Sequence, residues 1–315
     1  MNEFHFSAEE LVSHPEAVKE KGVTELEITD SSILGDKTKL SLLLQNFARK
    51  APDVFLKFRI DVALLDRKLV DSFSLVPCCL MFDFKPSFLD ADKKFFKNKV
   101  NLLNDAGLVF GFNIDTKEFA TMKKFRLCID EAVSYYPNHI YIQNENLKPT
   151  DKLSTQDIKS IQNLSFALET FYTYGRAVPW FMPVLQSLRL RPSILISDFA
   201  EWQACNNCGR TTGFAPENAP FTEIEKMQLS FLQLKYEEKR LSHIYQASSD
   251  LIKLHAALSL CDSDGTETVL KLSYNPEDLL SPYAMDLASF AEEVCMEMCE
   301  VKIFNTENGA DFKVI

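Results

Sequence analysis

Glycine is scarce in this chain, at 9 of 315 residues. Loops that cradle phosphate groups depend on closely spaced glycines, and neither GxGxxG nor the P-loop sequence GxxxxGK followed by Ser or Thr occurs. The five histidines show no HxH, HxxxH or HExxH spacing, and GxSxG is absent. The sequence therefore marks no common nucleotide loop, no histidine metal motif and no nucleophile elbow.

Long apolar runs and a surplus of positive charge are also missing. No run approaches 18 uninterrupted apolar residues, and the first residues lack the basic-then-apolar layout of a signal peptide. The net charge of −11 argues against a broad phosphate-binding surface, because such surfaces rest on Lys and Arg. We expect a cytoplasmic protein with neither a membrane nor a nucleic acid as partner.

Five short apolar segments are present in the first half, and each ends in polar or charged residues. They cover residues 24–30, 54–61, 79–85, 108–115 and 139–145. Helical patterns separate them at intervals typical of βα units, and such alternation predicts a parallel sheet. With a possible leading strand at 3–6, we predict an α/β fold whose residues 1–150 form a partial (β/α)5-6 parallel barrel.

The pattern changes after about residue 150. Residues 151–262 are predicted to form a helical extension, with one long helix over 222–260. Residues 263–315 are predicted to form a small α+β module, with a helix over 276–298. The dipeptide Asn308-Gly309 predicts a hairpin between the last two strands.

The charged residues at the strand ends are the candidate catalytic groups. In parallel barrels, functional side chains gather where the strands end. The candidates for acid–base or substrate-anchoring roles are Glu27, Asp30, Arg59, Asp61 and Asp83. A pocket with both signs of charge suits a polar small molecule. The alternative is that these charges only solvate the loops.

Two of the eight cysteines have the spacing of metal ligands. Cys205 and Cys208 form a CxxC pair in a loop with Gly and Pro, which is common in zinc and iron–sulfur sites. On the predicted helix, Cys295 and Cys299 lie four residues apart and could complete a four-cysteine site. The alternative is that these thiols are buried and free, as cysteines usually are.

The order of the segments resembles the radical S-adenosylmethionine superfamily, in its cobalamin-dependent type with a helical extension. The resemblance covers about residues 7–200. Residues 7–21 resemble the helix after the cluster loop, and residues 58–66 resemble the third strand and its helix. Residues 102–108 resemble the helix-to-strand junction before the fifth strand, and Pro179-Trp180-Phe181 the start of the extension. The resemblance implies a partial barrel that uses an iron–sulfur cluster and S-adenosylmethionine.

The chain departs from that family at its chemistry. The CxxxCxxC motif that holds the cluster is absent, and no cysteine precedes Cys78. Residues 113–118 stand where a glycine-rich turn toward the cofactor is expected. The resemblance therefore implies a degenerate member, and we assign no residue to S-adenosylmethionine.

Three functions stay open at this point. The first is a ligand-binding or accessory subunit whose partner protein supplies the redox centre. The second is an enzyme that acts on a polar small molecule in the charged strand-end pocket. The third is an interaction protein stabilised by a metal at Cys205 and Cys208.

Overall fold

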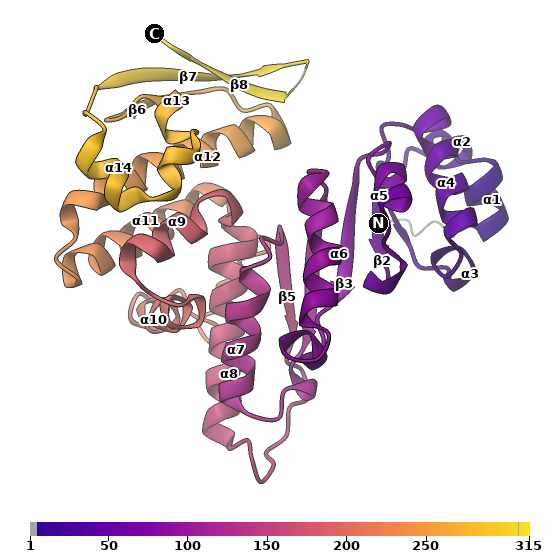
Figure 1. The fold of residues 1–315 in the computed structure, drawn as a ribbon, viewed down its shortest axis with the longest axis horizontal. Coiled ribbons are helices and arrows are strands. Elements are labelled where there is room, and N and C mark those ends of the chain that lie inside the picture. Colours follow the sequence, from indigo (N-terminus) through magenta and orange to yellow (C-terminus); the bar gives the residue numbers. More distant parts are fainter. Residues whose placement is uncertain (1–4, 308) are drawn as a thin grey trace. The chain divides into compact units, whose positions relative to one another are not determined.

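The computed structural model describes residues 5–307 and 309–315, which divide into two compact units (Figure 1). The first unit runs to Leu147 and the second begins at Lys148. Among the described residues, no helix combines the length and the apolar character that a membrane span needs. The strand predicted at 3–6 falls partly outside the described residues, and His5 and Phe6 are not in a strand.

The first unit is an α/β structure built on five parallel strands in sequence order, as predicted. The strands are β1 (Glu25–Ile28), β2 (Phe55–Arg59), β3 (Cys78–Asp83), β4 (Val109–Asp115) and β5 (His139–Gln143). The helices before and between them are α1 (Ala8–Ser13), α2 (Glu16–Glu20), α3 (Ser31–Leu34), α4 (Lys37–Lys50), η1 (Val62–Leu64), α5 (Arg67–Phe73), η2 (Pro86–Leu89), α6 (Lys93–Asp105), η3 (Thr116–Glu118) and α7 (Met122–Val133). β1 and β5 are the two edges of this sheet within the described residues, so the sheet is open.

The crossover helices pack against one face of the sheet. Parallel neighbours joined in sequence order by right-handed crossovers place all their helices on the same side. The even-numbered strand residues face these helices: the rings of Phe58 and Phe73 lie 5.2 Å apart, and those of Phe96 and Phe112 lie 5.5 Å apart. The core of the unit therefore lies on the even-numbered face.

Much of that core is aromatic. Phe84 lies within 5.7 Å of Phe88, Phe96 and Phe112, measured between ring centroids. Phe88 stacks on Phe96 at 4.1 Å. All four rings are buried, and each buried aromatic side chain removes a large apolar area from water. This cluster fixes the loop after β3, because Phe88 belongs to that loop.

Gly111 in β4 lies at a crowded point of the opposite, odd-numbered face. A Cβ atom here would lie 2.7 Å from the His139 carbonyl oxygen and 2.8 Å from the Met81 sulfur. Both neighbours are aligned with Gly111 across the strands. Glycine is therefore required for close packing, and its backbone φ is not positive.

The second unit combines a helical layer with a three-stranded antiparallel sheet. Its helices are α8 (Thr155–Leu168), the π-helix η4 (Glu169–Tyr174), α9 (Val178–Leu188), α10 (Pro192–Cys205), α11 (Phe221–Glu238), α12 (Ser242–Asp264), α13 (Pro276–Leu279), η5 (Pro282–Met285) and α14 (Leu287–Glu293). Its strands are β6 (Thr268–Leu272), β7 (Cys299–Thr306) and β8 (Gly309–Val314), and all three contact α12.

Two predicted helices of this unit are wrong in their extent. The helix predicted over 222–260 is two helices, because Arg240 takes a left-handed conformation (φ 60°) and the Leu241 N–H bonds the Tyr236 carbonyl. The helix predicted over 276–298 breaks into α13, η5 and α14, and Cys299 already belongs to a strand. The predicted hairpin is confirmed by the antiparallel pairing of β7 and β8, although Asn308 lies outside the described residues.

Asp250 is a fully buried carboxylate on α12. It accepts hydrogen bonds from the Gln246 side-chain amide (2.8 Å) and the Ser273 backbone N–H (2.5 Å). The second bond ties the end of β6 to α12. Burial raises the pKa of Asp250 above its ordinary value, because a buried carboxylate loses hydration.

We predict that Gly111→Ala destabilises the first unit by about 1–3 kcal/mol, because the new methyl group overpacks the space between Met81 and His139. Urea unfolding followed by circular dichroism measures the cost. Gly209→Ala is the matched control, since its nearest neighbour would lie at 3.5 Å, an ordinary contact. Equal stability of the two variants would contradict the crowding.

A second prediction concerns Asp250. A raised folded-state pKa contributes stability at low pH that is lost as the pH rises through that pKa. Asp250→Asn should remove this slope, which begins above the ordinary aspartate pKa of about 4, and be at least as stable as the wild type at pH 7. Asp250→Ala should cost about 1–3 kcal/mol, because it leaves buried donors unpaired. Unfolding can be followed through Trp180 and Trp202, both in this unit.

The control for that experiment is Asp264→Asn, at the end of the same helix. Hydrogen bonds from Thr266 lower the pKa of Asp264, so its effect on the pH slope has the opposite sign. If Asp250→Asn lost as much stability as Asp250→Ala at pH 7, the ionised carboxylate would be net stabilising and the prediction would fail.

Candidate functional site

The candidate site lies on the odd-numbered face of the five-stranded sheet. The register pairs odd residues with odd residues in every strand pair: Glu27 with Lys57, Arg59 with Met81, and Asp83 with Asn113. Side chains alternate between the two faces of a sheet, so all odd-numbered strand residues share one face. Because helices cover the even-numbered face, the charged side chains at odd positions lie on the opposite face of the sheet.

The β1 and β2 part of this face carries an ion pair. The Lys57 ammonium lies 2.6 Å from the Glu25 carboxylate, and Glu27 is aligned with Lys57 across the two strands. Lys57 also lies opposite Cys79 of β3, and burial raises the pKa of that thiol to about 11. Cys79 is therefore a protonated, weakly reactive thiol at neutral pH.

Arg59 and Asp83 meet at the carboxyl ends of β2 and β3. One Asp83 oxygen lies 2.8 Å from Arg59 Nη2 and accepts a 3.1 Å hydrogen bond from Nε. The pair borders a pocket of about 260 Å³, whose lining residues are Arg59, Ile60, Asp61, Val62, Asp83, Lys85 and Phe88. Two cations and two carboxylates thus surround one small cavity.

Aspartate caps hold three of the loops that follow the strands, and one of these loops borders the pocket. Asp61 accepts a 2.8 Å hydrogen bond from the Ala63 N–H and begins η1. Asp30 accepts one from the Ser32 N–H and begins α3, and hydrogen bonds from Ser32 lower its pKa. The same arrangement recurs at Asp115, which begins η3. Each of these aspartates caps a helix with its side chain, so its first role is to position the loop.

The β4 and β5 part of the face is less charged. The rings of His139 and Tyr141 stack with centroids 6.0 Å apart. Asn113 lies between Asp83 and Tyr141 in the register, and Gly111 lies between Met81 and His139. Most charged residues of this face therefore lie on β1, β2 and the end of β3, and β4 adds Asp115 at its end, where it caps η3.

Three of the five predicted catalytic residues come together in the structure. Arg59, Asp61 and Asp83 line the pocket. Glu27 shares the odd-numbered face but does not line the pocket, and Asp30 caps α3 outside it. These three side chains therefore lie around one cavity, and their role in catalysis stays a prediction.

The list of candidates omitted Lys57 and Lys85. Both share the sequence signal that marked the others, since Lys57 lies two residues before Arg59, and Lys85 lies two residues after Asp83. Phe88 was also missed, and no sequence signal separates it from the other 24 phenylalanines. Period-two alternation within β2 identifies Lys57, and its extension past the end of β3 identifies Lys85.

The four predicted metal-binding cysteines differ in their exposure to solvent. Cys205 and Cys295 are exposed, Cys208 is buried, and Cys299 lies between these extremes. The helix that would have aligned Cys295 with Cys299 ends at Glu293, so the prediction that both cysteines lie on one helix is wrong. In the described part of the chain, no three His, Cys, Asp or Glu side chains are grouped as a metal site requires.

The first unit also offers no fit for an iron–sulfur cluster. Its cysteines within the described residues are Cys78, Cys79 and Cys128, which are all buried and free. Burial raises the pKa of all three thiols, whereas cluster ligation needs thiolates. The residues present do not match the three-cysteine loop that the resemblance implies.

Comparison with known proteins gives a distant likeness at the level of structure. No protein-family model matches the sequence, and no curated protein matches it. A solved structure of the radical S-adenosylmethionine methyltransferase TsrM from Kitasatospora setae, with cobalamin and a 4Fe–4S cluster bound, aligns at a TM-score of 0.36 and 15% identity. The alignment covers 44% of this chain and 30% of that enzyme. A likeness of this size carries no functional conclusion for this chain.

Proposed function

We propose that the first unit binds a small polar molecule at the carboxyl ends of β2 and β3, in the pocket lined by Arg59 and Lys85. The observation that supports this is the charge around the pocket: the even-numbered face of the sheet holds the core, and charged residues of both signs border a cavity where the two strands end. A surface built only for solubility has no need of a cavity lined by opposed charges.

The available groups suggest the chemistry of the ligand. Lys85 makes no ion pair within the described residues, and Arg59 uses Nε and Nη2 on Asp83, so Nη1 is left to bind an anion. Asp61 and Asp83 each use one oxygen in the bonds described above, so each has a second oxygen for an amine or hydroxyl. A carboxylate with an amine or hydroxyl a few bonds away, as in an amino acid or hydroxy acid, suits this arrangement.

The wider proposal is that this unit belongs to a degenerate radical-S-adenosylmethionine-like protein that acts as a ligand-binding or accessory subunit. The segment order supports it, and the chain's own residues do not fit a cluster, so a partner protein would supply the redox centre. The second candidate function is an enzyme that acts on a polar small molecule. Glu27 supports this candidate, because its carboxylate has no hydrogen bond or ion pair within the described residues and could accept a proton.

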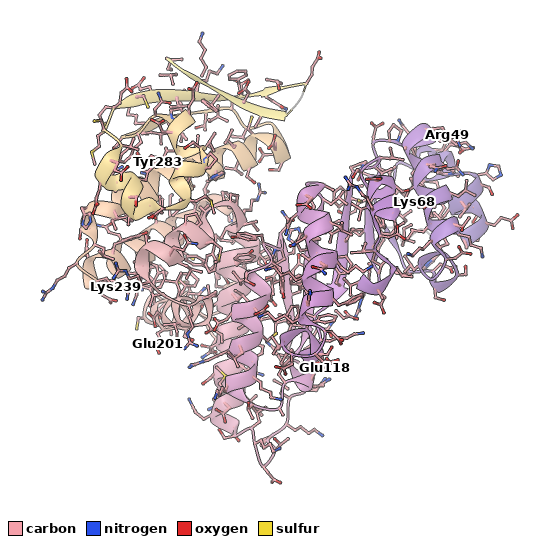
Figure 2. The ribbon with its side chains drawn as sticks, viewed as in Figure 1. Arg49, Lys68, Glu118, Glu201, Lys239 and Tyr283 are labelled. Carbon is pink, nitrogen blue, oxygen red and sulfur yellow. The ribbon has the colours of Figure 1, made fainter. Side chains whose placement is uncertain are left out.

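The binding proposal predicts hits in a screen of amino acids and hydroxy acids by saturation-transfer NMR. Arg59→Met and Lys85→Met should each weaken a hit about tenfold, the value of one charge-assisted contact. Arg49→Met and Lys68→Met are matched controls, since both cations are exposed on helices of the same unit (Figure 2). Hits that survive both pocket variants, or no hit at millimolar concentration, would refute the proposal.

The same variants should fold normally. Arg59 and Asp83 are about half exposed, and exposed ion pairs are worth at most about 1 kcal/mol. We therefore expect Arg59→Met and Asp83→Asn to change the free energy of unfolding by less than about 1 kcal/mol. A larger loss in urea unfolding would mean that the pair serves stability, and the binding result could not then be read as loss of a ligand contact.

A further inference from the structure

The second unit contains a larger pocket that the proposed function does not use. It has a volume of about 700 Å³ and lies between the end of α9, the turn from α11 to α12, and α14. Ligand pockets typically measure about 300–1,000 Å³. All three walls belong to the unit that begins at Lys148, so the pocket is a feature of that unit alone.

Three cationic or basic side chains line this pocket: Arg189, Lys239 and His243. Arg189 ends α9 in a left-handed conformation (φ 53°), and Lys239 ends α11 (Lys239 is labelled in Figure 2). The side chains of all three are without an ion pair or hydrogen bond among the described residues. The chain as a whole is acidic, with a net charge of −11, so three basic groups around one cavity differ from the rest of the sequence.

Of the two carboxylates in the pocket, Asp286 is already engaged in hydrogen bonds. One of its oxygens accepts from the Ala288 and Ser289 N–H groups, and the other from the Ser289 hydroxyl. Glu292 has no hydrogen bond or ion pair among the described residues. Three basic side chains and one carboxylate are therefore free to bond with a ligand.

The base of the pocket is apolar and fixed. Leu188 and Ile244 are buried core residues that also line the cavity. Beside them, the Ser187 hydroxyl lies 2.6 Å from the Tyr236 hydroxyl and donates to the Val184 carbonyl. A cavity with an apolar base and cationic rim matches a molecule with a carbon body and an acidic head.

We infer that this pocket is a binding site for a small organic anion. Its carboxylate or phosphate group would contact Arg189, Lys239 and His243, and its carbon body would lie over Leu188 and Ile244. This site is independent of the pocket at Arg59, because the two lie in different units.

Isothermal titration calorimetry on the full chain, at about 0.15 M ionic strength so that charges outside the pocket are screened, tests the inference with phenyl phosphate, benzoate and inorganic phosphate. The first two probes share a ring and differ in the acid group, so they separate a phosphate site from a carboxylate site. Inorganic phosphate lacks the carbon body and should bind more weakly than phenyl phosphate. Arg189→Gln and Lys239→Met should each weaken binding about tenfold. Glu292→Gln should strengthen binding, because it removes a repulsive carboxylate.

Arg240→Gln is the matched control. Arg240 follows Lys239, has the left-handed conformation of Arg189 and carries the same charge, but does not line the pocket. Its loss should change affinity by less than about twofold. Equal weakening in Arg240→Gln and Lys239→Met would overturn the inference, as would no binding of any probe at millimolar concentration.

Affinity for phenyl phosphate should be unchanged in Arg59→Met, which separates this site from the first. If Arg189→Gln fails to fold, Lys239→Met and Glu292→Gln carry the test.

Discussion

The register of the five parallel strands is the constraint on which the rest of the first unit depends. Odd residues pair with odd residues from β1 to β5, so each strand contributes to the same two faces. A slip of one residue in any strand would turn its core side chains outward and its charges inward. Burial of Phe58, Leu80 and Phe112 holds the register, and the positions of Lys57, Arg59 and Asp83 follow from it. The charged face is thus a consequence of how the core is packed.

The aromatic core and the pocket at Arg59 are joined through one loop. Phe88 stacks on Phe96 on its core side and lines the pocket on the other, so the loop that carries Lys85 rests on a buried ring. Asp61 fixes the neighbouring loop by capping η1. A site in which loops are held by a packed ring and a backbone cap is preorganised, which reduces the ordering cost of binding. The charges themselves contribute little stability and are available for a ligand.

The positions of the five parallel strands could be predicted from the sequence, whereas the breaks in the helices could not. Alternation of apolar and polar residues predicted the five strands and the face shared by Arg59 and Asp61. The break in the long helix depends on Arg240 in a left-handed conformation, and no local signal announces it because the residue is not glycine. The break before Cys299 removed the helical spacing on which the cysteine site rested. Asp30 and Asp61 show the limit for the site: an aspartate after a strand has the same sequence signature whether it caps a helix or binds a substrate.

The most direct test of the two-faced sheet is thiol labelling along β2. Single variants Lys57→Cys, Arg59→Cys, Leu56→Cys and Phe58→Cys can be labelled in the folded protein and read by mass spectrometry, with exposed Cys205 and Cys295 as internal references. We expect rapid labelling at 57 and 59 and slow labelling at 56 and 58. Similar labelling rates at all four positions would contradict this arrangement, because they would show that the sheet does not separate a core face from an open charged face.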